Sequence, residues 1–258
     1  MTNHDHPAAP GIGSRLGSSS CWFSSGASSR LRLIVAVGAL MTMAGCASTA
    51  PVKQIDRLES VGENPRILVM EPDIKYYLLT AGGIPEPHAE WTTAARKNFA
   101  NALKAYADER GTDIVMISDS VPPGSAEIAY SKLHGAVGYT IQVNYFGQSP
   151  LPSKDGGFDW GLGPGVAEIG EKYNADYALF SYYRDYQASG GRIAFALLAA
   201  VAGVGVSTGS EHGFASLVDL KTGDIVWFNV IYVGAGELRD AKGATTAVAQ
   251  LFANMPER

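Results

Sequence analysis

The segment ADYALFSYYRDY, residues 175–186, decides the fold class of this chain. It is typical of a strand with aromatic side chains on both faces, because its aromatic residues fall at odd and at even positions. Such a strand fits a sheet that is packed on its faces, and it also fits a protein interface, where tyrosine is enriched. Tyr182, Tyr183 and Tyr186 are therefore candidates for an interaction surface as well as for the core.

On the amino-terminal side of this segment, strands and helices alternate. Two apolar runs predict strands at 66–70 and 112–118, and a loop punctuated by glycine and proline is expected at 78–87. Apolar residues at helical spacing predict three helices, which begin near Trp91, Ile128 and Val166.

On the carboxyl-terminal side, residues 213–220 and 225–233 predict two strands joined by KTGD (221–224). Gly223 suits the left-handed position of a tight hairpin, and residues 239–255 predict a closing helix. The expected fold class is therefore α/β, a single domain whose mixed β-sheet is flanked by helices and ends with a β-hairpin and a helix.

An apolar run between these strands, residues 193–206, has no charged residue and is too short to span a bilayer as a helix. Its first interpretation is a buried helix that packs on the sheet. It also fits an apolar patch that docks a partner or a second copy, or a segment that enters the outer membrane, alone or in a ring. In those two cases Phe195, Leu198 and Ala200 belong to the interaction surface.

A second apolar run, LRLIVAVGALMTMAGCAS at residues 31–48, ends on a small residue and a cysteine. It is short for a membrane span but fits the apolar segment of an export signal, with Arg30 and Arg32 as its basic flank. Its end resembles a bacterial lipobox, in which small residues precede a cysteine that is lipidated and becomes the first residue of the mature protein. Cys46 is therefore the expected lipidation site, and the alternatives are a plain signal peptide with an incidental cysteine and a retained transmembrane anchor.

The chain is expected to divide into three parts. Residues 1–45 are an extension plus a lipoprotein signal peptide, 46–64 a tether, and 65–258 a periplasmic α/β domain. The tether is polar and contains proline, as flexible linkers often do. The stretch before Arg30 is rich in glycine and serine and holds Cys21, which fits a start codon assigned too far upstream.

Charge excludes some partners. The net charge is −5, and it becomes −7 without residues 1–45, which hold three basic residues and one acidic one. An acidic body lacks the electrostatic footprint of a nucleic-acid-binding protein, and it would need the lipid at Cys46 to stay on a membrane. Ala47 follows the cysteine where an aspartate would stand in lipoproteins retained at the inner membrane, and this resemblance to the enteric sorting rule favours the outer membrane.

Candidates for chemistry are few. Residues 205–209, GVSTG, match the G-x-S-x-G elbow of serine hydrolases, which requires a strand before the serine, a helix after it and a later histidine. Only His212 follows Ser207, and the next segment is expected to be a strand, so a hydrolase is the weakest alternative. His88 and His134 lie far from each other and from His212, no metal or other cofactor is expected, and His134 is expected on the solvated side of its helix.

The strings LLTAGGIPEPHAEWTTAA (78–95) and ADYALFSYYRDY (175–186), with GFASLVDLKTGDIVWFN (213–229), resemble a group of proteobacterial lipoproteins. The order of elements over residues 65–255 is similar to the domain shared by CsgG, LpoB and the N-terminal part of TolB. The resemblance implies a domain that works by protein contact, as a pore, an activator or part of an envelope machine. It transfers no functional residue, and this chain has one apolar insertion where CsgG-like pores use two amphipathic hairpins.

The sequence thus predicts an outer-membrane lipoprotein that faces the periplasm and serves as a binding or assembly component of the cell envelope. It is not expected to be an enzyme. Its expected partners are the membrane, through Cys46, and envelope proteins or further copies of itself. A membrane-inserting oligomer that uses residues 193–206 is the first alternative.

Overall fold

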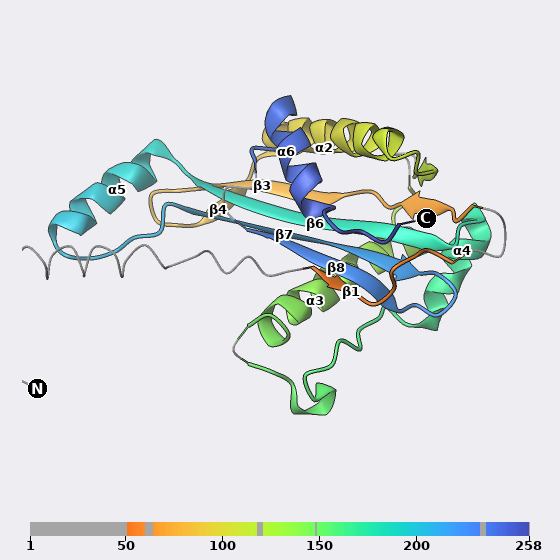
Figure 1. Ribbon diagram of the computed structural model, residues 1–258. Coiled ribbons are helices and arrows are strands. Elements are labelled where there is room, and N and C mark those ends of the chain that lie inside the picture. The colour runs from red at the N-terminus through yellow and green to blue at the C-terminus, as the bar shows by residue number, and fades with distance from the viewer. Residues whose placement is uncertain (1–50, 60–63, 118–120, 148, 233–235, 258) are drawn as a thin grey trace, which may run out of the picture. The chain divides into compact units, whose positions relative to one another are not determined.

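The computed structural model describes residues 51–59, 64–117, 121–147, 149–232 and 236–257 (Figure 1). The predicted signal segment and Cys46 lie outside the described residues.

The described chain is an α/β domain, which confirms the predicted fold class. Its strands are β1 (Val52–Lys53), β2 (Ile67–Val69), β3 (Asp73–Leu79), β4 (Pro85–Pro87), β5 (Ile114–Met116), β6 (Tyr177–Ala188), β7 (Gly209–Asp219) and β8 (Ile225–Tyr232). Its α-helices are α2 (Ala89–Glu109), α3 (Ala126–Asn144), α4 (Ala167–Tyr173), α5 (Gly190–Val201) and α6 (Ala241–Leu251). Two short 3-10 helices, Pro152–Lys154 and Pro164–Val166, lie in the long segment before α4.

The eight strands form one mixed sheet. Six of them follow the order β1-β8-β7-β6-β2-β5, and β3 and β4 lie off this path. β6 is its central strand and pairs antiparallel with β7 on one side. On the other side β2 and β3 follow one another along the same edge of β6, both parallel to it. The register places Ile67 of β2 beside Tyr177 and Asp73 of β3 beside Tyr182.

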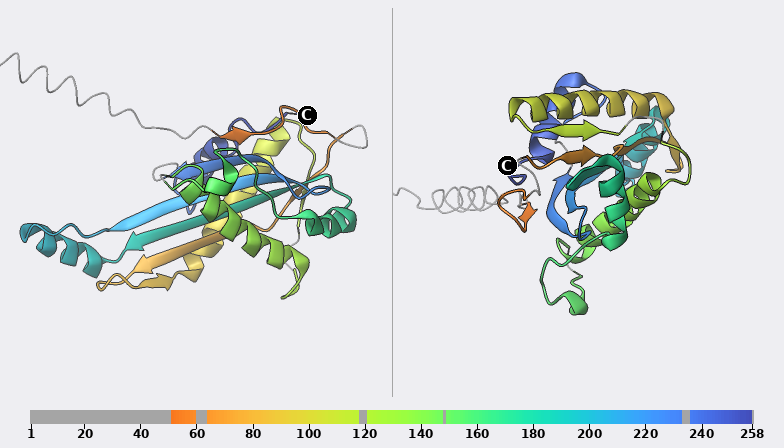
Figure 2. Two further views of the ribbon diagram at one scale, coloured as in Figure 1. Left: turned by 90° about the horizontal axis from the view of Figure 1, so that it is seen from below. Right: turned by 90° about the vertical axis from the view of Figure 1, so that its right-hand side faces the viewer.

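Helices cover both faces of this sheet, α2 and α6 on one side and α3 on the other (Figures 1 and 2). The residues of β6 alternate between the two cores, as the aromatic pattern predicts. Tyr177, Leu179 and Tyr183 belong to the core beneath α2 and α6. Ala178 and Phe180 belong to the core on the side of α3. Removal of these side chains from water on both faces is the main stabilising contribution expected for the domain.

Helix α3 lies very close to the sheet because it carries glycine where it crosses β7. A Cβ atom built on Gly138 would stand 1.9 Å from a ring carbon of Phe214. One turn earlier, a Cβ on Gly135 would lie 3.2 Å from the ring of Tyr182. The close approach of α3 to the sheet therefore depends on the absence of a side chain at Gly135 and Gly138.

Side chains define the starts of the helices. Ser125 Oγ accepts a hydrogen bond from the backbone N–H of Ile128 at the start of α3, at 3.5 Å. Asp240 does the same for Gly243 at the start of α6, at 2.9 Å. These contacts satisfy backbone donors that have no partner inside the first turn.

The predicted hairpin at KTGD is confirmed. Asp219 Oδ1 accepts from the backbone N–H groups of Lys221 and Thr222, at 2.7 and 3.2 Å. Gly223 has a φ of +84°, and a Cβ there would lie 2.1 Å from the carbonyl oxygen of Gly163. Both the left-handed backbone and the close approach of the neighbouring segment favour glycine at this position.

The structure corrects the prediction of a loop at 78–87. Part of it continues β3, and Pro85–Pro87 forms β4, which pairs antiparallel with β3. β4 is an edge strand, where proline is tolerated because one side of the strand makes no ladder hydrogen bonds.

The segment predicted as a tether also differs. Val52 and Lys53 form β1 and pair with Phe228 and Trp227 of β8. Further along, Leu58 is buried in the core. The described part of this segment therefore belongs to the folded domain from Val52 onward.

Candidate interaction surface

Helix α5 leaves the end of β6 and leads into β7, and it projects beyond the ends of these strands (Figures 1 and 2). Its start is fixed by Ser189, whose Oγ accepts a hydrogen bond from the backbone N–H of Arg192 at 3.2 Å. Its end turns at Gly203, with a φ of +77°, and the N–H of Val204 donates to the carbonyl of Ala199 at 2.9 Å.

The interpretation of the apolar run as a buried helix is wrong. No residue of α5 is buried, and Leu198 and Val201 are 74% and 90% exposed. The physical reason is its position, because the sheet that would cover it has already ended at Ala188. The exposed large apolar side chains of this region are Ile193, Phe195, Leu197, Leu198, Val201 and Val204.

The base of α5 is attached to the neighbouring turn between β3 and β4. The Arg192 guanidinium donates to the carbonyl of Ser207 at 3.0 Å and to that of Ala81 at 3.4 Å. Ile84, in the same turn, is 66% exposed and extends the apolar surface. We call Ile84 together with the exposed apolar residues of 193–204 the α5 surface. Sequence reasoning missed Ile84, because an isolated isoleucine in a turn carries no signal of its own.

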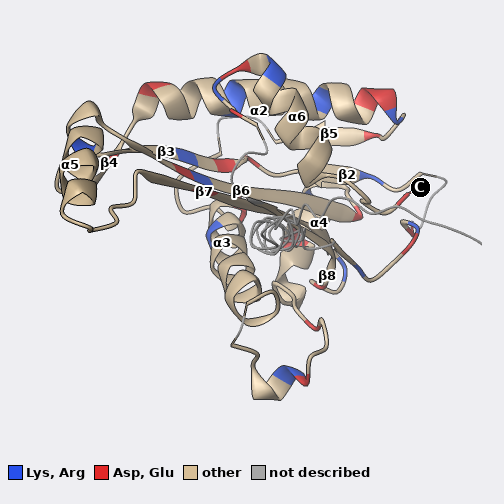
Figure 3. Ribbon diagram, turned by 60° about the vertical axis from the view of Figure 1, so that its left-hand side comes forward, with Lys and Arg blue, Asp and Glu red and all other residues tan. Residues whose placement is uncertain are grey.

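The α5 surface is almost uncharged. Arg192 is the only charged residue between Tyr186 and Ser210, and Figure 3 shows α5 otherwise without basic or acidic residues. None of the helices in the described residues is long and apolar enough to cross a membrane. An exposed apolar surface of this kind usually marks contact with a protein or a membrane.

The predicted surface residues separate into two groups. Phe195, Leu198 and Ala200 lie exposed on α5. Tyr183 is 3% exposed and belongs to the core, so it is not part of a surface. Tyr182 and Tyr186 are half-buried on the sheet. They stack on Phe214 and Tyr77 with ring centroids 4.7 and 4.8 Å apart, so most of their area already has a partner.

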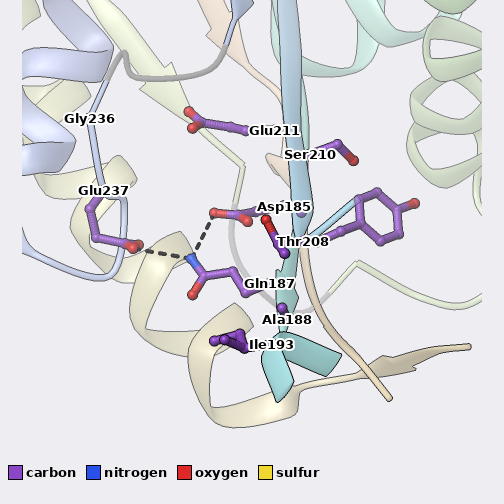
Figure 4. Close-up of a pocket in the computed structure, with 11 residues that line it drawn as sticks. Asp185, Gln187, Ala188, Ile193, Thr208, Ser210, Glu211, Gly236 and Glu237 are labelled. Atoms are coloured by element: carbon purple, nitrogen blue, oxygen red, sulfur yellow. Dashed lines mark hydrogen bonds between the residues drawn. The ribbon is translucent and has the colours of Figure 1, made fainter. Parts of the chain in front are cut away.

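A groove of about 790 Å³ lies behind the base of α5 and holds three carboxylates, Asp185, Glu211 and Glu237 (Figure 4). Gln187 donates to Asp185 at 3.3 Å and to Glu237 at 3.4 Å. Burial raises the pKa of Asp185 to about 6. Hydrogen bonds from Arg239 lower the pKa of Glu237 to about 2.

One carboxylate of this groove, Glu237, already has its partners. The charge of Glu237 is already matched by Arg239, whose Nε donates to it at 2.8 Å. Tyr76 also donates to Glu237, at 3.0 Å. Among the residues that the structure describes, no three His, Cys, Asp or Glu side chains are grouped so that they could hold a metal ion.

Ser207 does not lie on a nucleophile elbow. It follows helix α5 and precedes strand β7, which is the reverse of the strand–serine–helix order that the elbow requires. Its hydroxyl donates to the carbonyl of Gly209 at 3.2 Å. His212 lies within β7, where it pairs with Arg184 of β6.

The prediction that His134 is solvated is wrong. It is 1% exposed, because α3 presents it to the sheet, where its Nε2 lies 2.8 Å from Ser216 Oγ. Its ring also packs against Phe180 and Phe214, with centroids 5.0 and 5.3 Å away. Burial lowers the pKa of His134 to about 3, so the ring is neutral at neutral pH.

No family model matches the chain, and no curated protein matches it. Among solved structures, the PelC dodecamer from Paraburkholderia phytofirmans has a TM-score of 0.36 at 12% identity, covering 81% of this chain and 96% of that one. Lipoprotein GNA1162 from Neisseria meningitidis has 0.29 at 12% identity, covering 65% and 80%. The LpoB C-terminal domain from Salmonella enterica has 0.25 at 16% identity, covering 68% and 86%. TM-scores below 0.5 assign no function, and the proposals below rest on this chain's own residues.

Proposed function

We propose that this chain is a lipoprotein of the bacterial envelope, held at the outer membrane by acyl chains on Cys46, with its folded domain in the periplasm. In this proposal it is a binding or assembly component and performs no catalysis. The observation that carries the proposal is the α5 surface. Most of it lies on a helix of twelve residues, none of which is buried.

Leaving this many apolar side chains in water lowers the stability of the domain, and selection normally removes such exposure. Burying a leucine or valine side chain stabilises by about 1.5–3 kcal/mol, and the helix leaves this contribution unused in the isolated domain. A protein that keeps Leu198 and Val201 in water is therefore expected to cover them when it works. The surface supports a contact function, because the side chains present there are apolar and carry no reactive group.

The attachment point is supported by the sequence around Cys46. An apolar run, a basic flank and a small residue before the cysteine fit an export signal with a lipidation site. The position of β1 supports close attachment, since only six peptide steps separate Val52 from Cys46. Fully extended, they span at most about 22 Å.

A test of the anchor compares three chains expressed in a Gram-negative host with labelled palmitate. The parent is expected to incorporate label and to fractionate with outer membranes, and Cys46→Ser is expected to lose both properties. Cys21→Ser is the matched control, because it removes the other cysteine from the segment expected to be cleaved. Equal labelling of Cys46→Ser and parent would contradict the proposed anchor.

A membrane-inserting oligomer is the second candidate, favoured by the same exposed helix. It requires several α5 helices to enter the membrane side by side. Size analysis of the detergent-extracted protein distinguishes the two, because this candidate predicts a ring and a monomeric particle would exclude it.

A further inference from the structure

The exposed face of α5 extends around most of the helix. Successive residues are 100° apart, and the half-covered ones, Arg192, Ala196 and Ala199, fall on one side at i, i+4 and i+7. The rest of the circumference is exposed and apolar, including Phe195 and Val201 on different sides. A flat protein surface covers one side of a helix, whereas lipid chains cover all sides. This distribution therefore favours lipid as the occupant.

The length of α5 fits one leaflet. Twelve helical residues rise about 18 Å. The hydrocarbon core of a bilayer is about 30 Å thick, so one leaflet offers about 15 Å. The helix is therefore about as long as one leaflet is deep and too short to cross to the other side.

The direction of β1 relates its amino-terminal end to the end of the sheet that carries α5. Val52 pairs with Phe228 and Lys53 with Trp227, so the chain before Val52 enters β1 from the side of Tyr232. Tyr232 pairs with His212 near the start of β7, and β7 follows α5. The amino-terminal end of β1 therefore points toward the end of the sheet that carries α5.

The covalent reach of the anchor matches the distance to that end. Val52 pairs with Phe228, which pairs with Ser216, and Ser216 lies seven residues from Gly209, where β7 begins. Seven strand residues span about 23 Å. The six steps from Cys46 to Val52 span at most about 22 Å when fully extended, which places the acylated Cys46 within a few ångströms of the level where β7 begins.

The segment of α5 itself carries one positive charge and no negative charge, whereas the carboxylates of this end lie in the groove behind its base. No acidic residue lies between Tyr186 and Ser210, although the chain as a whole is acidic. Arg192 is at the base of α5, where an inserted helix would meet the headgroups. The side chains from Ile193 to Val201 contain no hydrogen-bonding group.

We propose that α5 is a second membrane contact, inserted into the same leaflet that holds the acyl chains of Cys46. This inference rests on the proposed lipid anchor. The acyl chains hold one point of the domain at the membrane, and an apolar helix beside the anchor adds buried apolar area and fixes the orientation of the domain. The domain would then stand with the α5 end of its sheet at the bilayer.

The test uses the acylated full chain reconstituted in vesicles of phosphatidylethanolamine and phosphatidylglycerol. The mature chain has no other cysteine, and acylation blocks the thiol of Cys46, so Leu198→Cys supplies the only reactive thiol for an environment-sensitive fluorophore. Tyr139→Cys, at a 58% exposed site on α3, is the matched control. Vesicles with quenchers on the lipid acyl chains should reduce the fluorescence at position 198 at least twofold and leave position 139 unchanged.

Two results would overturn the inference. In one, position 198 is not quenched and cross-links between copies, which assigns α5 to a protein contact. In the other, it is neither quenched nor cross-linked. Flotation of the same vesicles reads the anchor separately. If the parent chain floats with the vesicles but position 198 is not quenched, the inserted helix is contradicted and the anchor is not. If the Cys46→Ser chain floats as well as the parent and position 198 is quenched, the anchor is contradicted and the inserted helix is not.

Discussion

The buried histidine of α3 makes a quantitative prediction about acid stability. His134 is 1% exposed and its ring lies against Ser216 Oγ, at 2.8 Å, between two phenylalanines. Burial depresses its pKa to about 3. The negative charge of Asp73 acts in the opposite direction and raises the pKa, but by less. In an unfolded chain the pKa of histidine returns to about 6.5.

Between pH 6.5 and pH 3 the unfolded chain therefore binds a proton at His134 that the folded chain does not. Stability rises with pH wherever the unfolded state binds more protons, so acidification destabilises the fold. The full shift corresponds to about 5 kcal/mol, and about 2 kcal/mol of it is lost between pH 7.5 and pH 5.0. Below the folded pKa both states are protonated and this loss stops growing.

Urea unfolding followed by circular dichroism at pH 7.5 and pH 5.0 measures this loss. His134→Gln is the control, because an amide can keep a hydrogen bond to Ser216 and does not titrate. The burial of Asp185 raises its pKa to about 6, which acts in the opposite direction between pH 3.8 and 6, but it is common to both chains and cancels. The parent should lose about 2 kcal/mol more than His134→Gln. A difference below about 0.5 kcal/mol would refute the assignment of a neutral buried histidine.

Three further predictions concern packing and exposure. Gly138→Ala should destabilise the domain by about 1–3 kcal/mol in thermal unfolding, because its methyl group would overlap the ring of Phe214, and an unchanged melting temperature would contradict the close approach of α3. Val201→Asp should leave the unfolding free energy within about 0.5 kcal/mol of the parent, since the side chain is 90% exposed, and a large loss would mean that α5 is buried in the isolated domain. Asp73→Asn should cost about 3 kcal/mol, because it leaves the buried guanidinium of Arg184, now 2.6 Å from the carboxylate, without its counter-charge, and a neutral result would show that the pair is solvated.

The central part of the fold could be predicted from the sequence because its signal is local. The two-sided apolar pattern of 175–186 specifies a buried strand, and β6 shows the predicted alternation between two cores. KTGD specifies its hairpin through Gly223. The sequence does not predict β3, since Asp73 and Lys75 interrupt its apolar pattern, and its support comes from pairing with β6 more than a hundred residues away.

The environment of single residues could not be predicted, because it depends on partners distant in sequence. His134 finds Ser216 across 82 residues, and nothing local distinguishes a buried histidine from a solvated one. The apolar composition of α5 is the same whether the helix is covered or exposed. Only the end of β6 at Ala188 shows that the sheet does not extend far enough to cover it.

The lipid anchor, on which the proposed function depends, is tested most directly by the intact mass of the protein extracted from membranes with detergent. The account predicts a chain that begins at Cys46 and carries fatty acyl groups on that residue. A chain that retains residues before Cys46, or one that begins there without acyl groups, would contradict it.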